Sequence, residues 1–416
     1  MNSQQSLNIV VGVGGGIAAY KACHLVRFFK EQGHTVRVVP TESALKFVGA
    51  ATFEALSGNP VSATVFDAVD EVQHVRIGQT ADLIVIAPAT ADVMARMVAG
   101  RADDLLTATC LVATCPVVVA PAMHTEMWLH PATQANVHTL RHRGTVVLEP
   151  AHGRLTGTDS GPGRLPEPEQ IGTVALAVAK AGALPRDLEG RKLLITAGGT
   201  QENLDPVRYL GNRSSGRQGF ALAEIAVHRG AEVTVIAGAT DSLPTPPGAQ
   251  VVRVGSARDM AAAVAERAGE QDAFIMAAAV ADFRPKTQAT AKLKKGSDDQ
   301  ALATLTLVEN PDILATTVKQ RESGDVKPNA VIVGFAAETG SPGHTPLELA
   351  QAKLARKGCD LLMLNEVGQG KVFGQLTNQG KLLGRDGSVQ DIGAGTKFDV
   401  AMAIIDGLVA ALQPVN

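Results

Sequence analysis

The chain has 416 residues, a formal net charge of −3 at pH 7 and four cysteines, none of which form a C-x-x-C pair. This length exceeds one ordinary hydrophobic core and predicts two or three domains, with two favoured. The slightly acidic charge gives no reason to expect nucleic acid, whose binders carry clustered basic charge, so we expect small-molecule substrates.

The first residues, MNSQQSLNIV, lack the basic and long apolar regions of a signal peptide. No apolar run in the chain approaches the roughly 18 residues of a membrane helix. Together with the absence of zinc-ribbon or thioredoxin-like cysteine spacing, this predicts a reduced, cytoplasmic protein with no membrane association.

A strand, a glycine turn, a helix and a second strand are predicted next. LNIVVGV (7–13) is apolar and β-branched, GGG interrupts it, the stretch 17–32 has helical spacing, and TVRVVPT (35–41) is typical of a strand. The same order returns at 191–238, where SSGRQGFALAEIAVHRG supplies a glycine-led helix. Two α/β domains are therefore predicted.

Four continuous apolar stretches predict parallel strands that helices bury on both faces. Ligands of such sheets bind outside the carboxyl ends of the strands. Between the halves, GALPRDLEG (182–190) is typical of a domain boundary, which we place near residue 188, giving domains 1–188 and 189–416. The four stretches are DLIVIAPAT (82–90), PVVVAPAM (116–123), DAFIMAAAV (272–280) and NAVIVGFAAE (329–338).

The turn GVGGGIAAYK (12–21) brings backbone N–H groups to the start of a helix, where they can bind a phosphate. It does not match G-x-G-x-x-G, because Ile17 stands at the third glycine, and Thr41 and Ser43 follow the second strand instead of a ribose-binding acid. A mononucleotide such as FMN is favoured over NAD. A turn that needs glycine only for its backbone geometry remains the alternative.

Two histidine segments lie near predicted strand ends. His74 precedes the strand that ends in PATAD (88–92), although an isolated histidine is more often a surface or core residue. PAMHTEMW (121–128) offers His124 and Glu126, but their spacing with His130 matches no standard zinc pattern. Core packing of the methionines and the tryptophan remains an alternative for this stretch.

In the second half, AGGTQENLDPVRYLGNRSSGRQG (197–219) gathers arginines, serines and glycines that could form an anion cradle or an ordinary surface loop. Lys353 and Lys357 are four residues apart and so lie on one helix face, though single lysines are usually solvated. No P-loop motif occurs. The combination favours a nucleoside triphosphate held without a P-loop.

Over essentially the whole chain the sequence resembles the bifunctional phosphopantothenoylcysteine decarboxylase and phosphopantothenate–cysteine ligase family of bacterial coenzyme A synthesis. The motifs that carry this resemblance in the first half are GGIAAYK, TESA, APATAD, DDLLT, PAM…MW and GPGR; those in the second are TAGGT, DPVRY, NRSSG, AAVADFRP, KLKK, NPDI and GFAAE. The resemblance implies an α/β protein of two Rossmann-like domains with parallel-type sheets. The N-terminal one would be a flavodoxin-like, flavin-binding decarboxylase domain and the C-terminal one a ligase domain.

For the first half, the resemblance implies FMN as cofactor and His74 as catalytic base. His124 stands where the family has an asparagine that binds the substrate carboxylate, and Gly157 stands near the position of a flap cysteine that protonates the ene-thiol. The residues at matching flavin-binding positions are Gly14, Gly15, Gly16, Ile17, Thr41, Ser43, Thr90, Ala91, Asp92 and Met123.

For the second half, the resemblance implies that CTP activates phosphopantothenate as an acyl-cytidylate, with Mg²⁺ neutralising the phosphates, before cysteine forms the amide. Asn212 would hold the acyl intermediate, Arg208 would support the loop or the substrate, and Lys292 would stabilise the α-phosphate. Further nucleotide contacts would come from Met276, Ala277, Ala278, Asp282, Asn310, Pro311, Asp312, Ile313, Phe335, Lys353 and Lys357.

Two alternative functions remain open at this stage. The absence of the flap cysteine permits a flavin decarboxylase that stops at the ene-thiol, and the fold also permits a regulatory flavoprotein that has lost activity. The resemblance further implies a homo-oligomer, in which trimers of the first half and pairs of the second combine into a dodecamer.

Overall fold

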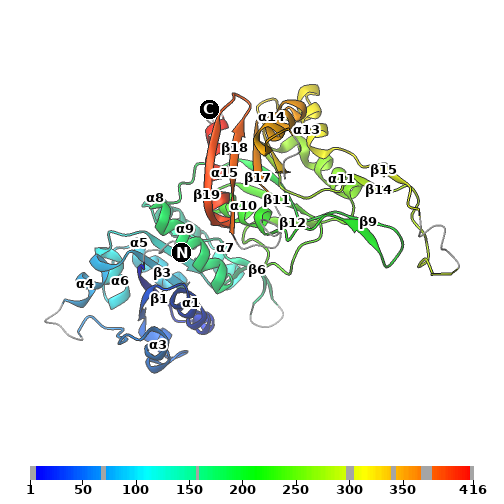
Figure 1. Cartoon of the computed structure of the whole chain (residues 1–416). Coiled ribbons are helices and arrows are strands. Elements are labelled where there is room, and N and C mark those ends of the chain that lie inside the picture. Colours follow the sequence, from blue (N-terminus) through cyan, green and yellow to red (C-terminus); the bar gives the residue numbers. More distant parts are fainter. Residues whose placement is uncertain are drawn as a thin grey trace. The chain divides into compact units, whose positions relative to one another are not determined.

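The structure, a computed structural model, describes residues 6–66, 72–155, 159–296, 304–338, 343–366 and 377–412. The chain divides into two compact units, Met1–Pro185 and Arg186–Asn416 (Figure 1). The division falls three residues before residue 188, because Leu188 is fully buried in the core of the second unit.

The first unit is built on a five-stranded parallel sheet in the order β2-β1-β3-β4-β5. This is the strand order of flavodoxin-like sheets, with its switch point between β1 and β3. All seven residues of β3 are buried, as expected for a strand covered on both faces. The strands are β1 (Asn8–Val13), β2 (Thr35–Pro40), β3 (Leu83–Ala89), β4 (Val117–Pro121) and β5 (Val146–Val147).

Two groups of helices pack with this sheet. In the first group α1 contacts α3 and α9; in the second α5 contacts α6 and α8, and α6 contacts α4. The antiparallel strands β6 and β7 lie between α8 and α9 in the sequence. The elements are η1 (Ile17–Ala19), α1 (Tyr20–Glu31), α2 (Glu42–Leu45), α3 (Ala50–Ser57), α4 (Gln73–Thr80), α5 (Ala91–Val98), α6 (Leu105–Val112), α7 (Thr125–Leu129), α8 (Pro131–His142), β6 (Ala151–Arg154), β7 (Ser160–Arg164) and α9 (Pro168–Ala181).

The second unit contains an eight-stranded sheet in the order β12-β11-β8-β13-β16-β17-β18-β19. The strands from β12 to β17 pair in parallel, whereas β18 and β19 extend the sheet in antiparallel pairing. The strands are β8 (Lys192–Ala197), β11 (Glu232–Ala237), β12 (Gln250–Arg253), β13 (Ala273–Met276), β16 (Val331–Glu338), β17 (Leu361–Glu366), β18 (Thr377–Gly384) and β19 (Val389–Thr396).

Helices cover both faces of this second sheet. Along β8, Leu193 and Ile195 belong to one apolar cluster and Leu194 belongs to another, so alternate residues pack on opposite layers. The first cluster includes α10 and α15, and the second includes α11, α13 and α14. These helices are α10 (Arg217–His228), α11 (Ala257–Arg267), η3 (Ala268–Glu270), α13 (Ile313–Ser323), α14 (Pro346–Lys357) and α15 (Lys397–Ala411).

A buried arginine connects the start of the second unit to its C-terminal helix. Arg229 follows α10 and is only 2% exposed. Its Nε and Nη2 atoms donate to the Asp187 carboxylate at 2.8 and 2.6 Å, and its Nη1 donates to Asp406 on α15. The guanidinium therefore joins the first residues of the unit to its last helix.

Two antiparallel hairpins follow the parallel strands β8 and β13. β9 (Gln201–Asn203) pairs with β10 (Tyr209–Gly211), and β14 (Phe283–Pro285) pairs with β15 (Leu307–Glu309). Figure 1 shows β9, β14 and β15 on the side of this unit away from β18 and β19. Among the described residues, no helix of either unit is both long and apolar enough to span a membrane.

Candidate functional site

A cavity of about 810 Å³ lies in the first unit at the carboxyl ends of strands β1 to β4. This is the edge where the topology of the sheet predicts a ligand. The cavity wall contains all but one of the residues predicted to bind a flavin. Those in the wall are Gly15, Gly16, Ile17, Thr41, Ser43, Thr90, Ala91, Asp92 and Met123.

The exception is Gly14, which lies just behind the wall and shapes it. Its N–H donates to the Pro88 carbonyl at 2.9 Å, and a Cβ added at Gly14 would lie 2.7 Å from that oxygen. A Cβ at Gly15 would lie 2.3 Å from the Cβ of Ser43, whereas one at Gly16 would meet nothing within 4 Å. The glycine turn is therefore packed against the ends of β2 and β3, with open space beyond Gly16.

A helix begins at the cavity. Thr90 is the N-cap of α5 and accepts a hydrogen bond from the Val93 N–H at 3.2 Å. The remaining N–H groups of the first turn and the helix dipole favour a negative charge at this end. Thr41 likewise accepts from the Ala44 N–H at 3.2 Å, which fixes its backbone at the wall.

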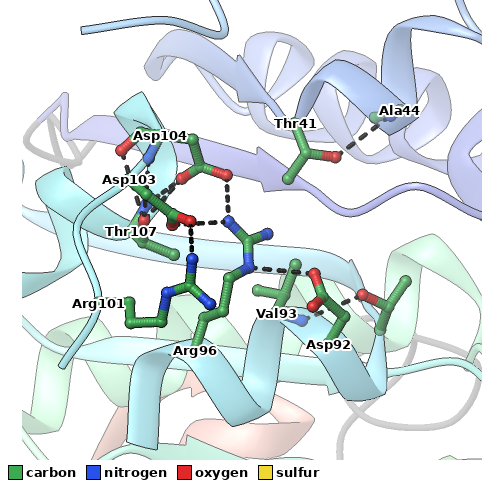
Figure 2. A network of polar contacts seen from close by, with 10 residues as sticks. Thr41, Ala44, Asp92, Val93, Arg96, Arg101, Asp103, Asp104 and Thr107 are labelled. Atoms are coloured by element: carbon green, nitrogen blue, oxygen red, sulfur yellow. Dashed lines mark hydrogen bonds and ion pairs between the residues drawn. The ribbon is translucent and has the colours of Figure 1, made fainter. Parts of the chain in front are cut away.

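Arg96 of the cavity wall contacts three carboxylates (Figure 2). Arg96 donates to Asp92 at 3.0 Å, to Asp104 at 2.6 Å and to Asp103 at 3.3 Å. Burial alone would lower the pKa of Arg96, but the hydrogen bond and charge of Asp104, with the other carboxylates, raise it. Since Asp104 is also the N-cap of α6, the guanidinium connects the cavity wall to the start of that helix.

Cationic side chains form another part of the cavity wall. Lys21 is 8% exposed, and its Nζ donates to Glu167 at 3.1 Å and to the Leu165 carbonyl at 3.3 Å. Arg164 contacts the same Glu167 oxygen at 2.6 Å, and Arg154 lines the cavity from β6. Sequence reasoning did not select these residues or Arg96, although Lys21 and Arg164 end the quoted motifs GGIAAYK and GPGR.

The stretch PAMHTEMW is divided between cavity and core. Met123, the exposed His124 and Met127 line the cavity, whereas Trp128 is 5% exposed and packs in the core. The Met123 N–H donates to the Gly163 carbonyl at 3.0 Å, so hairpin β6–β7 is held beside it. Within the described ranges, no group of three histidine, cysteine, aspartate or glutamate side chains could hold a metal.

His74 does not reach this cavity in its own chain. It is half-buried in the first turn of α4, a helix that packs against α6, and it is not part of the cavity wall. Gly157, near the predicted flap position, lies outside the described residues.

In the second unit, the predicted substrate residues lie on the loop between β8 and α10. The Asn212 side chain donates to the Val280 carbonyl at 3.0 Å, which ties this loop to the segment after β13. Arg208 donates to Asp205 through Nε at 3.0 Å and Nη2 at 2.6 Å, and Nη2 also donates to the Leu293 carbonyl at 2.8 Å. Arg208 thus stabilises its own loop and also binds Leu293. Lys292, the residue before Leu293, is exposed.

The predicted nucleotide residues come from β13, β16, α13, α14 and the segments that flank the β14–β15 pair. Asn310 donates to the Ala281 carbonyl at 2.9 Å, next to Asp282. Asp312, the N-cap of α13, pairs with Lys357 of α14. The remaining residues are Met276, Ala277 and Ala278 at the end of β13, Pro311 and Ile313 around that N-cap, Phe335 in β16 and the half-buried Lys353 in α14.

Comparison with known families gives these two sites a context. Residues 1–180 match the family described as flavoprotein, and residues 188–412 match the C-terminal domain of the DNA/pantothenate metabolism flavoproteins. A flavodoxin-like unit with a cavity at its switch point, followed by this second domain, defines a two-domain flavoprotein.

Individual relatives narrow this class. The coenzyme A biosynthesis bifunctional protein CoaBC of Mycolicibacterium smegmatis is 60% identical over 406 residues, covering 97% of this chain and 98% of the relative. That of Mycobacterium tuberculosis is 59% identical over 405 residues, covering 97% and 96%. The chain belongs to the family of coenzyme A biosynthesis bifunctional proteins. It is a bifunctional enzyme, and the alternatives of a partial decarboxylase or a regulatory flavoprotein are not favoured, because both halves match.

A solved structure is also similar to part of this chain. The crystal structure of the C-terminal domain of a coenzyme A biosynthesis bifunctional protein CoaBC is 34% identical, covers 54% of this chain and 97% of its own, and aligns with a TM-score of 0.44.

Proposed function

We propose that the second unit joins cysteine to 4′-phosphopantothenate with CTP, and that the first unit decarboxylates the product, 4′-phosphopantothenoylcysteine, with FMN. The observation that carries the proposal is the cavity of about 810 Å³ at the switch point of the first sheet, with the glycine turn and a helix N-terminus in its wall. Membership in a bifunctional family over both halves supports the pairing of the two reactions.

The residues present fit FMN. The turn at Gly15 and Gly16 and the N-terminus of α5 would hold an anionic phosphate. FMN bound here would supply the oxidation and re-reduction that allow a cysteine carboxylate to leave as CO₂. Lys21, Arg154 and Arg164 line the same cavity and would neutralise the phosphate of the substrate.

His124 would donate a hydrogen bond to the carboxylate that leaves as CO₂. It is exposed at the N-terminus of α7 and lines the cavity, so its imidazole is accessible to a ligand. An imidazole and an asparagine amide both provide an N–H donor, and His124→Asn should therefore retain CO₂ release. An inactive Asn variant that still binds FMN would refute this role.

His74 would act as the catalytic base in the site of a neighbouring copy. Its absence from the cavity of its own chain supports a site completed between subunits of a trimer. Exposed apolar side chains of the first unit, among them Leu111 at 61% and Leu129 at 58%, also support association of copies. With pairing of the second units, this arrangement gives a dodecamer.

A complementation experiment tests this assignment. His74→Ala alone should abolish CO₂ release and keep amide formation, and Gly15→Ala should lose FMN. Co-expression of the two variants should restore part of the CO₂ release, because a mixed trimer contains sites with an intact cavity and an intact His74 from another copy. Mixed trimers without any restored activity would refute the shared site.

In the ligase half, Lys292 would stabilise charge on the α-phosphate of CTP and Asn212 would hold the acyl-cytidylate. Asp282 directly precedes β14, and Asn310 directly follows its partner strand β15. The ion pair between Lys357 of α14 and Asp312 lies two residues further along the chain, and this grouping supports a nucleotide site beside Asn310. Mg²⁺ would neutralise the triphosphate, since no P-loop lysine is present to do so.

The whole proposal is tested by incubating the purified chain with 4′-phosphopantothenate, cysteine, Mg²⁺ and CTP, followed by mass analysis. We expect 4′-phosphopantetheine, CMP and pyrophosphate, with the amide accumulating in flavin-free protein. A parallel reaction with ATP measures the nucleotide preference, and EDTA should stop amide formation. Absence of the amide with either nucleotide would refute the ligase assignment.

A further inference from the structure

A buried carboxylate lies under the loop that follows β9. The side chain of Asp205 is 0% exposed. Its Oδ1 accepts hydrogen bonds from the backbone N–H groups of Val207 and Arg208, both at 2.8 Å. Its Oδ2 accepts Nε and Nη2 of Arg208 at 3.0 and 2.6 Å and also the Leu293 N–H at 3.2 Å. One carboxylate therefore organises a local turn and a segment almost 90 residues away in the sequence.

The backbone of Leu293 is held on both sides by this pair. Its N–H donates to Asp205, and its carbonyl accepts from Arg208 Nη2 at 2.8 Å. A further tie joins the Ala289 N–H to the Leu204 carbonyl at 2.9 Å. The stretch from Ala289 to Leu293 is thus docked on the β9–β10 turn through its backbone, while the side chain of Lys292 stays exposed.

We propose that Asp205 is a positioning residue of the ligase reaction: it fixes the backbone at Leu293 and thereby places the Lys292 ammonium at the nucleotide. This inference rests on the proposed role of Lys292. A lysine side chain is long and flexible, so the position of its backbone decides how often the ammonium meets a phosphate. The neighbouring peptide, clamped at N–H and C=O, limits that position.

The geometry also separates the parts played by Asp205 and Arg208. Arg208 donates to Asp205 through Nε and Nη2 and to the Leu293 carbonyl through Nη2. It therefore connects Asp205 to the segment that contains Lys292. A lysine at position 208 could keep a charge next to Asp205, but its single ammonium could not reproduce the planar fork. Arg208→Lys should therefore lower kcat of amide formation less than Asp205→Asn does.

Steady-state kinetics of the full-length chain test the inference. Asp205→Asn should lower kcat of CTP-dependent amide formation by about 10- to 100-fold, as expected for a misplaced catalytic group, and leave KM for cysteine unchanged. Release of CO₂ from supplied 4′-phosphopantothenoylcysteine serves as an internal control and should not change. Asp386→Asn is the matched control, because Asp386 also accepts a backbone N–H two residues ahead, from Ser388 at 3.0 Å, but in the β18–β19 turn.

A double variant distinguishes positioning from a general loss of structure. If Asp205 acts through Lys292, the Asp205→Asn/Lys292→Ala chain should be no slower than Lys292→Ala alone. Independent, multiplicative losses would overturn the inference, as would an unchanged kcat in Asp205→Asn. Full amide formation by Lys292→Ala would instead refute the proposed role of Lys292, and the positioning role with it. Should Asp205→Asn fail to fold, Arg208→Lys must lower kcat when Lys292 is present and cause no further loss in the Lys292→Ala chain; otherwise the inference is wrong.

Discussion

Gly15 offers the sharpest test of how the flavin cavity is built. A methyl group at this position would lie 2.3 Å from the Cβ of Ser43, 2.8 Å from its carbonyl carbon and 3.1 Å from the Ala44 nitrogen. Two of these neighbours are backbone atoms, so the start of α2 must move. Overpacking of this kind costs about 1–3 kcal/mol. In a unit of this size that cost lowers Tm by roughly 2–12 °C.

The assay is calorimetry of flavin-free protein, followed by titration with FMN monitored by flavin fluorescence. Gly15→Ala should lower the Tm of the first unit and weaken FMN binding, whereas the transition of the second unit stays in place. Gly16→Ala is the control, since its Cβ would meet nothing within 4 Å and should leave the flavin-free Tm unchanged. Equal Tm values for Gly15→Ala and the parent chain, or an equal loss in both variants, would refute the packing argument.

Three further outcomes are expected. Arg96→Gln should destabilise the first unit by about 2–3 kcal/mol, somewhat less than for a fully buried pair, and adding Asp104→Asn should recover part of this loss in urea unfolding. Burial opposes ionisation of Asp312, but its hydrogen bond from Lys357 holds its pKa below the ordinary value. Its contribution to stability is therefore present above about pH 4 and lost as pH falls further, so Asp312→Asn should flatten the fall of Tm below about pH 4. Burial raises the pKa of Cys359 to about 11, so mass spectrometry should find it unalkylated by iodoacetamide at pH 8 until urea is added; rapid labelling of the native chain would contradict this.

The parallel strands were predictable because each is buried on both faces. DLIVIAPAT and DAFIMAAAV have no polar alternation, and they form β3 and β13 in the centres of their sheets. The antiparallel additions β18 and β19 were not predicted. Neither strand has a regular alternation of buried and exposed residues. In Val389–Thr396, for example, only Ile392 is buried. Such a pattern is difficult to distinguish from a loop.

The cavity was predictable in outline, since glycine turns and strand ends must meet at one edge of a parallel sheet. The charges around it were not. Arg96 reaches Asp92 through ordinary i,i+4 spacing, which normally marks a solvated helix face, and only the fold adds Asp104 to the same guanidinium. The position of His74 outside the wall could not be predicted, because the packing of α4 against α6 sets it and the local sequence does not show that packing.

The ion pairs of Arg229 with Asp187 and Asp406 set the first residue that a fragment of the second unit must include. A fragment that begins at residue 189 lacks Asp187 and keeps a 2% exposed guanidinium with a single carboxylate partner. It also lacks Leu188, a fully buried part of the core. A ligase half produced on its own should therefore start upstream of Asp187, in the stretch that the sequence assigns to the preceding domain. Failure of a shorter fragment to fold would say nothing about the autonomy of that half.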